Sequence, residues 1–173
     1  MRLLIRQLEE DDQRAGFDCG DETLNDYLRR FAWQNQVRNQ VGVTWVAVEG
    51  SHPRLILGYY TLASASISRE RLAEAGCARL AYPEIPVILL ARLAVDRRFQ
   101  HRGIGELLLV HAVDRAVAVG RQVGCRGVVV DAYPKAVSWY EKFGFVTLPG
   151  AGPKSAAQKM FLDLRSASAG RRA

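Results

Sequence analysis

The residue pattern with the clearest chemistry is an anion-binding one, and it lies between Arg92 and Gly105. An apolar, strand-like run is followed there by a short basic loop, and Gly103 and Gly105 stand where a long helical pattern begins. Glycine exposes its backbone N–H without a Cβ in the way, and a helix N-terminus carries unpaired donors and a dipole worth about half a positive charge. This stretch therefore predicts a seat for a pyrophosphate.

Other interpretations of the two glycines compete with this one. A dinucleotide-binding fold needs three glycines in the pattern GxGxxG and an acidic residue at the end of the next strand, so it is a poorer match. A P-loop is excluded more firmly, because no Gly-Lys-Ser/Thr sequence follows. An ordinary tight turn before a helix is the structural alternative.

The periodicity of apolar residues indicates which elements hold this loop. Residues 104–122 are dense in Leu, Val and Ala and poor in turn residues, which predicts the main buried helix, and Asp21 can cap an amphipathic helix that runs to about residue 37. Further helices are expected at residues 69–75 and 136–143, and strands at 3–8, 43–49, 55–66, 87–95, 128–131, 145–148 and 159–164. This order predicts an α/β fold with a mixed sheet and helices on both of its faces.

The composition limits the number of domains and the compartment. The 173 residues suit one compact domain, expected at residues 1–165, and the small-residue segment 166–173 is expected to be a disordered basic tail. No apolar run approaches the roughly 20 residues of a membrane-spanning helix, and the N-terminus lacks the apolar core of a signal sequence. Three separated cysteines indicate free thiols, and no metal site is expected. We therefore expect a cytoplasmic protein without a membrane partner, whose net charge of +6 favours polyanions.

Two motifs resemble those of the GNAT superfamily of N-acetyltransferases. The pattern Gln100-x-x-Gly103-x-Gly105 after a strand-like run resembles motif A of that family, whose loop amides bind the coenzyme A pyrophosphate. Residues 136–145 resemble motif B, with Trp139 in place of the usual Phe. The resemblance implies the GNAT fold, acetyl-CoA as the cofactor, and a central sheet that is splayed between its two central parallel strands.

The same resemblance implies roles for individual residues. Tyr140 lies at the position of the family's general acid, and a phenol of pKa about 10 can donate to a thiolate yet stay protonated at neutral pH. A purely structural role in an aromatic core is the alternative for Tyr140. A backbone N–H near Val95 would be the oxyanion donor. The implied acetyl-CoA contacts are Leu93, Ala94, Val95, Gln100, His101, Arg102, Gly103, Ile104, Gly105 and Tyr140.

A longer pattern resembles the GNAT toxins of bacterial type II toxin–antitoxin systems. It comprises Phe17-Asp18-Cys19-Gly20-x-x-x-Leu24-Asn25-x-Tyr27-Leu28, followed by residues 57–62 and 90–96. In those toxins the acceptor is the α-amine of an aminoacyl-tRNA, and its acetylation blocks translation. Such an amine has a pKa of about 7.7–8.0, so a strong general base is not required, and none stands out in the motifs. The resemblance also implies a homodimer and a neutralising ribbon-helix-helix antitoxin, with DNA bound only through the antitoxin complex.

The positive charge gives the tRNA hypothesis further support, since phosphate contacts dominate affinity for nucleic acids. The candidates for contacts with the acceptor stem are Arg29, Arg30, Arg38, Arg92, Arg97 and Arg98, each of which could instead be a solvated surface arginine. Two other functions stay open. One is acetylation of a small amine or a protein N-terminus, and the other is a non-catalytic module that senses acyl-CoA or contacts nucleic acid.

Overall fold

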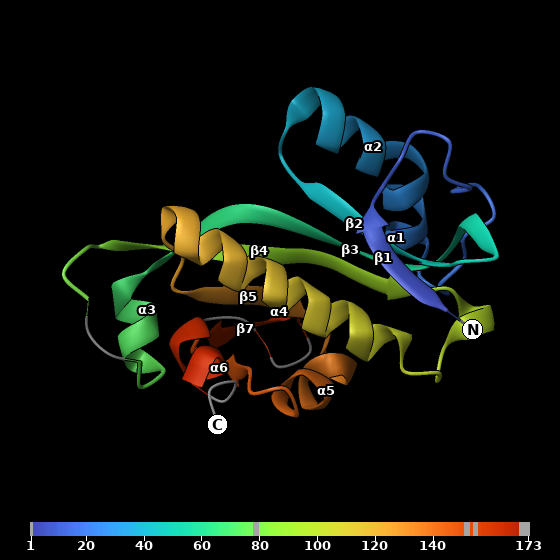
Figure 1. Ribbon diagram of the computed structural model, residues 1–173. Coiled ribbons are helices and arrows are strands. Elements are labelled where there is room, and N and C mark those ends of the chain that lie inside the picture. The colour runs from blue at the N-terminus through green and yellow to red at the C-terminus, as the bar shows by residue number, and fades with distance from the viewer. Residues whose placement is uncertain (1, 78–79, 151–152, 154–155, 170–173) are drawn as a thin grey trace. The chain divides into compact units, whose positions relative to one another are not determined.

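The computed structural model describes residues 2–77, 80–150, 153 and 156–169, and their contacts divide the chain into two compact units. The first unit comprises Met1–Ala63 and Ala91–Val113, and the second comprises Ser64–Leu90 and Asp114–Ala173. Three long elements run along the chain from one unit into the other (Figure 1): β3 (His52–Ser68), β4 (Glu84–Val95) and α4 (Ile104–Val123).

The first unit is built on three antiparallel strands. β1 (Leu3–Gln7) pairs with β2 (Val43–Glu49), and β2 pairs with the first part of β3. Side chains that alternate along these strands form a buried core with the segment that follows β1, and its members include Leu8, Phe17, Leu28, Val46, Val48, Ile56 and Tyr59. The last residues of β4 and the first half of α4 complete this unit, and between them lies the short 3-10 helix η3 (Arg97–Phe99).

One helical segment joins β1 to β2, and Figure 1 draws it in blue beside β2. Asp21 caps its start, because the Asp21 carboxylate accepts hydrogen bonds from the backbone N–H groups of Thr23 and Leu24. The segment is not one continuous α-helix as the periodicity predicted. It is divided into α1 (Glu22–Asp26), the π-helical η1 (Tyr27–Phe31), α2 (Ala32–Gln34) and the π-helical η2 (Asn35–Asn39).

The second unit contains the parallel strand pair. The first part of β4 pairs in parallel with β5 (Gly127–Ala132), and β7 (Gln158–Asp163) pairs in antiparallel with both β5 and β6 (Val146–Thr147). The register between β4 and β5 extends from Val87↔Gly127 to Leu90↔Val130, and both strands continue beyond it.

The rest of the second unit is mostly helical, and at Gly127 two strands approach closely. Besides the last half of α4, it contains α3 (Arg69–Glu74), the 3-10 helix η4 (Pro134–Ala136), α5 (Val137–Glu141) and α6 (Leu164–Ala169). A Cβ on Gly127 would overlap Phe161 Cε2 and would lie 2.5 Å from Leu162 O, so only glycine fits at this point of β5. The core here includes Ile67, Leu72, Ile85, Val87, Val129, Leu148 and Phe161.

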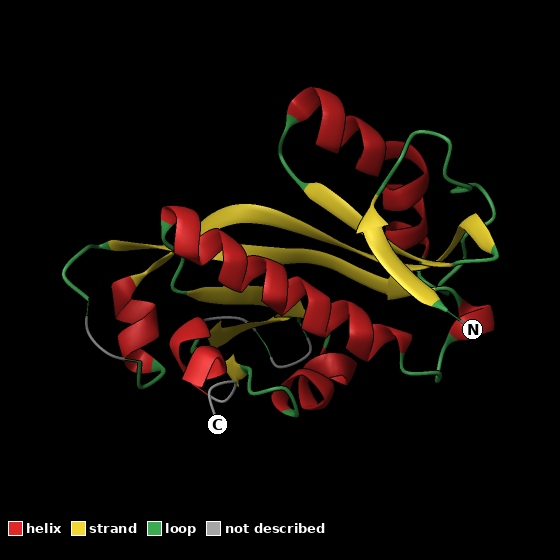
Figure 2. Cartoon of the chain, in the orientation of Figure 1, coloured by secondary structure: helices red, strands yellow, loops and turns green. Residues whose placement is uncertain are grey.

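Parallel and antiparallel strand pairs with intervening helices confirm the predicted α/β class with a mixed sheet (Figure 2). The bounds of β2 coincide with the predicted residues 43–49, and α4 ends one residue after the predicted end. The segment 166–173 was expected to be a disordered tail. Its residues 166–169 instead belong to helix α6, and residues 170–173 lie outside the described residues. No helix in the described part of the chain has both the length and the apolar character needed to cross a membrane.

Candidate functional site

The predicted anion seat lies in the first unit, in a loop that we call the glycine loop and that comprises residues 96–103. β4 ends at Val95, and α4 begins at Ile104. The backbone reaches the helix through two residues in the left-handed region, His101 with φ 60° and Gly103 with φ 78°. Since the first intrahelical bond runs from Leu107 N to Gly103 O, the three N–H groups before Leu107 have no acceptor within the helix.

The surroundings of the glycine loop suit an anion. A Cβ built on Gly103 would meet no atom within 4 Å, and His101 and Arg102 are exposed, so the space beside these residues is open. The guanidinium groups of Arg98 and Arg102 lie over the ring of Phe99, at 5.5 and 5.6 Å from its centroid. Open backbone donors at a helix start and the nearby cation of Arg102 are groups that suit a pyrophosphate.

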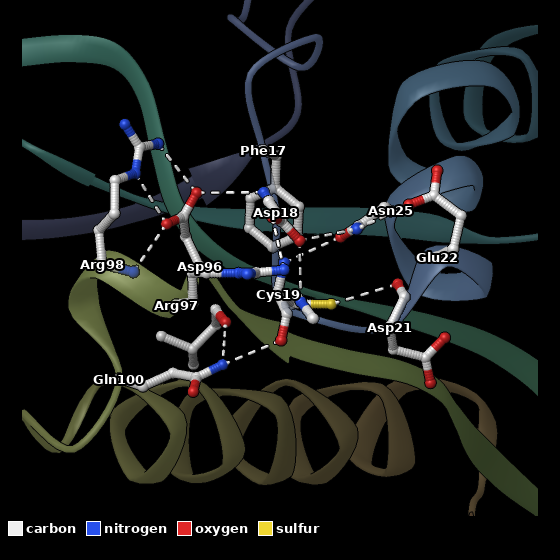
Figure 3. A network of polar contacts seen from close by, with 12 residues as sticks. Phe17, Asp18, Cys19, Asp21, Glu22, Asn25, Asp96, Arg97, Arg98 and Gln100 are labelled. Atoms are coloured by element: carbon white, nitrogen blue, oxygen red, sulfur yellow. Dashed lines mark hydrogen bonds and ion pairs between the residues drawn. The ribbon is translucent and has the colours of Figure 1, made fainter.

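A polar network, absent from the sequence-based prediction, holds the glycine loop (Figure 3). The Asp96 carboxylate is fully buried and accepts hydrogen bonds from the Arg98 side chain and from the backbone N–H groups of Arg98 and Asp18. Burial raises the pKa of Asp96, but these hydrogen bonds outweigh the burial and leave the pKa below its ordinary value. Asp96 is therefore a charged anchor at the end of β4.

Gln100 takes part in the same network through its side chain. Its Nε2 donates to Val95 O at 2.9 Å and to Cys19 O at 3.1 Å. The side-chain amide is thus directed at the protein backbone, and only the backbone of Gln100 is left for the phosphate contact that the sequence predicted. The strand residues Leu93, Ala94 and Val95 directly precede this loop, and Ala94 is buried.

Tyr140 lies in α5 of the second unit, in an aromatic cluster. Its ring meets Trp139 edge to face at a centroid distance of 4.9 Å and Phe145 at 5.4 Å, and the residue is buried. Burial raises the pKa of Tyr140 to about 12. The phenol is therefore protonated throughout the physiological range, as a proton donor must be.

Four of the six arginines that were candidates for tRNA contacts already have carboxylate partners. Arg29 pairs with Glu22 at 3.0 Å, and Arg30 pairs with Asp26 at 3.4 Å. Beside the glycine loop, Arg97 pairs with Asp18 at 2.7 Å and Arg98 pairs with Asp96 at 2.9 Å. Their charge is partly neutralised within the protein, which lowers their attraction for a phosphate.

The other two arginines have different surroundings. Arg92 lies with its guanidinium 4.9 Å from the centroid of the Tyr27 ring and donates to the carbonyl of Ala91 at 2.7 Å, and its Nε is buried without a partner among the described residues. Arg38 is exposed in η2. These two side chains keep more of their positive charge for an external partner than the paired four.

The network around Asp96 was missed because its members are far apart in the sequence. Asp18 and Asp96 are separated by 78 positions, and periodicity carries no information about such a contact. The signal that the sequence does carry is the polar stretch from Asp18 to Asn25. The structure brings this stretch to the glycine loop in the first unit.

The match to known families decides the class of the protein. A model described as "Acetyltransferase (GNAT) domain" matches residues 40–147, a range that includes both the glycine loop and Tyr140. The chain belongs to the GNAT acetyltransferase family. The acetyltransferase is also 36% identical over 147 residues to the protein named "tRNA-acetylating toxin" of Mycobacterium tuberculosis, and this similarity covers 83% of the chain and 84% of the relative.

Solved structures extend the similarity to nearly the whole acetyltransferase. AtaT complexed with acetyl-methionyl-tRNAfMet is similar with a TM-score of 0.87 and 30% identity, over 97% of this chain and 98% of that chain. A tyrosine-to-phenylalanine mutant of the toxin AtaT, bound to the C-terminus of the antitoxin AtaR and acetyl-CoA, is similar with a TM-score of 0.81 and 29% identity over 99% of both chains. The likeness therefore includes the N-terminal segment that lies outside residues 40–147.

Proposed function

We propose that this acetyltransferase is a toxin that transfers the acetyl group of acetyl-CoA to the α-amine of an aminoacyl-tRNA and so blocks translation. The observation that carries the proposal is the 36% identity to a tRNA-acetylating toxin over 83% of the chain. The likeness to AtaT in complex with an acetylated aminoacyl-tRNA supports the same acceptor.

The glycine loop and the residues beside it fit acetyl-CoA, which supplies an activated acetyl thioester when bound. The backbone N–H groups at the start of α4 would hold the pyrophosphate, together with the backbone of the loop and the cation of Arg102. The β4–β5 register ends at Leu90, before residues 93–95, which supports a splay that leaves the backbone of these residues to the pantetheine arm. A backbone N–H near Val95 would polarise the acetyl carbonyl.

Tyr140 would supply the proton for the departing thiolate. Because burial raises its pKa to about 12, Tyr140 Oη carries its proton at any pH at which the enzyme works. An ordinary thiol has a pKa of about 8.5, so complete transfer of the proton from this phenol to the free thiolate is uphill, and Oη would act mainly by donating a hydrogen bond to the sulfur while the C–S bond breaks. Donation from Oη at that moment would prevent the charge from building up on sulfur.

The acceptor would need little help to lose its proton. The α-amine of an aminoacyl group has a pKa of about 7.7–8.0, so a fair fraction is neutral at pH 7 and ready to attack. The protein would then contribute mainly by binding the tRNA. Arg38, which is exposed, and Arg92, which has no carboxylate partner among the described residues, are the strongest of the six arginine candidates for phosphate contacts.

Partners follow from the same proposal. The similarity to the AtaT–AtaR complex supports a neutralising antitoxin for this chain, which we propose to be of the ribbon-helix-helix type and to provide the contact with DNA. We further propose that the toxin is a homodimer and acts in the cytoplasm, where aminoacyl-tRNA is found.

The proposal is tested by the release of free coenzyme A from acetyl-CoA by the purified protein. Charged tRNA should support release, whereas the same tRNA after deacylation, or with its α-amine already acetylated, should not. Release that requires only a small amine or a peptide N-terminus, and is absent with charged tRNA, would contradict the proposed acceptor.

A further inference from the structure

Two stretches that lie far apart in the sequence, residues 17–20 and 95–100, are bonded to each other at several points. Arg97 N donates to Asp18 O at 2.8 Å, and Asp18 N donates to the Asp96 carboxylate at 3.2 Å. Their side chains add an ion pair of 2.7 Å between Arg97 and Asp18. We call residues 17–20, which are bonded in this way to residues 95–100, the N-terminal clamp (Figure 3).

Gln100 adds a further bond between the glycine loop and the N-terminal clamp. Its side-chain amide donates one hydrogen bond to Val95 O, at the end of β4, and another to Cys19 O, in the N-terminal clamp. A single side chain therefore fixes the exit of the strand, the N-terminal stretch and the loop that carries His101 and Gly103. No other group of the described residues bonds to both of these carbonyls.

Further hydrogen bonds connect the N-terminal clamp to α1. The Asn25 side chain is buried, donates to Asp18 Oδ1 at 3.0 Å and accepts from Cys19 N at 2.9 Å. Asp18 Oδ1 also accepts from Gly20 N at 2.9 Å, and Asp21 caps the helix immediately afterwards. The N-terminal clamp is consequently fixed by its hydrogen bonds to α1.

A loop that must present several N–H groups to an anion binds best when it is ordered before binding, because ordering it afterwards consumes binding free energy. The left-handed φ of His101 makes the free loop less favourable than ordinary loop conformations, so something must hold it. Asp96 at the start of the loop and Gln100 directly before His101 hold it through contacts with the protein that leave the side of the loop beside Gly103 open.

We propose that Gln100 is a positioning residue, which fixes the glycine loop against the N-terminal clamp so that the loop amides are preorganised for the coenzyme A pyrophosphate. This inference rests on the proposed use of acetyl-CoA but is independent of the acceptor. Gln100 acts through the backbone of the loop, and its side chain does not contact the cofactor.

The test compares Gln100→Met with Gln36→Met. Methionine has nearly the shape of glutamine but lacks the amide donors. Gln36 is a matched control in the first unit, because it also bonds two backbone groups, Leu8 O at 3.1 Å and Thr44 N at 3.0 Å, but lies outside the glycine loop. Binding of coenzyme A is measured by titration calorimetry, and kcat is measured with saturating acetyl-CoA.

We expect Gln100→Met to raise the Kd for coenzyme A about tenfold, which corresponds to the loss of one or two well-made hydrogen bonds, and to leave kcat within about twofold. Amide hydrogen exchange across residues 95–105 should become faster in Gln100→Met without ligand. Both variants should lower the melting temperature by similar amounts. Gln36→Met should nevertheless leave both the Kd for coenzyme A and the exchange of residues 95–105 unchanged.

The inference is overturned if Gln100→Met binds coenzyme A as the wild type does, or if both variants weaken binding equally. An unstable Gln100→Met protein still decides the matter through hydrogen exchange below its melting temperature, where slow exchange of residues 95–105 contradicts the proposal. Wild-type protein that binds coenzyme A but acetylates no charged tRNA would refute the proposed acceptor and leave this comparison intact.

Discussion

Arg98 donates two hydrogen bonds of 2.9 Å, from Nε and Nη2, to the two carboxylate oxygens of the fully buried Asp96. Such bidentate pairs combine charge with fixed geometry. The same carboxylate also accepts from two backbone N–H groups, so it fixes the backbone at the point where β4 becomes the glycine loop. Asp96 therefore links the stability of the first unit to the shape of the proposed cofactor site.

Replacement of Asp96 with Ala should lower the free energy of unfolding by about 2–3 kcal/mol, because two backbone N–H groups and a guanidinium lose a charged acceptor. Asp131→Ala is the control: it removes a surface ion pair with Lys159 of similar length, 2.7 Å, and should cost less than about 1 kcal/mol. Chemical denaturation of both variants measures the difference. Equal losses would show that Asp96 is no more than a surface charge.

The lowered pKa of Asp96 predicts a pH dependence of that difference. A carboxylate whose pKa is lower in the folded state stabilises the fold above its unfolded pKa of about 3.9, and this contribution is lost as the pH falls through the folded value. The free energy of unfolding of Asp96→Asn should therefore lie furthest below that of the wild type at pH 7, and this difference should shrink below about pH 4. A deficit that stays constant between pH 7 and pH 3 would contradict this assignment.

Gly58 in β3 has close neighbours on the side where a Cβ would point, because a Cβ there would lie 2.9 Å from Leu108 Cδ1 and 3.0 Å from Ala94 O. The third neighbour is Ile104 Cγ2 at 3.4 Å, at the start of α4. Gly58→Ala should destabilise the protein by about 1–3 kcal/mol and weaken coenzyme A binding through displacement of this helix start. Gly16→Ala, where nothing lies within 4 Å of the new Cβ, should change neither quantity.

Local features of the fold were predictable from the sequence, whereas contacts between distant residues were not. Alternating apolar residues placed β2, and the dense apolar run with glycines before it placed α4, because both patterns are set by neighbouring residues. The π-helical turns at residues 27–31 and 35–39 had no such signal. Gln100 was predicted at the cofactor loop, but its bond to Cys19 depends on tertiary structure alone.

Tyr140→Phe should lower kcat about a hundredfold or more, in the range for loss of a general acid, and leave the Kd for coenzyme A within about twofold. The ring contacts with Trp139 and Phe145 remain, so the melting temperature should be unchanged. Tyr82→Phe, at an exposed tyrosine, is the control and should be fully active. Unchanged turnover in Tyr140→Phe would remove the phenol from the mechanism.

The pKa of Tyr140 also predicts the pH profile of the wild type. Since burial raises this pKa to about 12, the phenol loses no proton below pH 9, and it contributes no falling limb there. The rate should instead rise with deprotonation of the acceptor amine, whose pKa is about 8. Short incubations with charged tRNA between pH 6 and pH 9 measure the profile. A falling limb within this range that disappears in Tyr140→Phe would contradict the elevated pKa.

Arg38→Ala and Arg92→Ala should each raise the KM for charged tRNA several-fold and reduce the salt dependence of tRNA binding by about one unit in the log–log slope, without changing the KM for acetyl-CoA. Arg121→Ala, at an exposed arginine near the end of α4, is the matched loss of one charge and should have little effect. If all three variants respond equally, net charge and not a defined surface accounts for tRNA binding.

The most direct test of the proposed function is the position of the acetyl group after reaction. Total charged tRNA is incubated with the wild-type protein and isotopically labelled acetyl-CoA, and the nucleotide and aminoacyl fragments are analysed by mass spectrometry. The proposed function predicts the label on the α-amine of an aminoacyl group still esterified to tRNA, and its absence with Tyr140→Phe. Label on a tRNA base, or on free amines and proteins with none on aminoacyl groups, would contradict it.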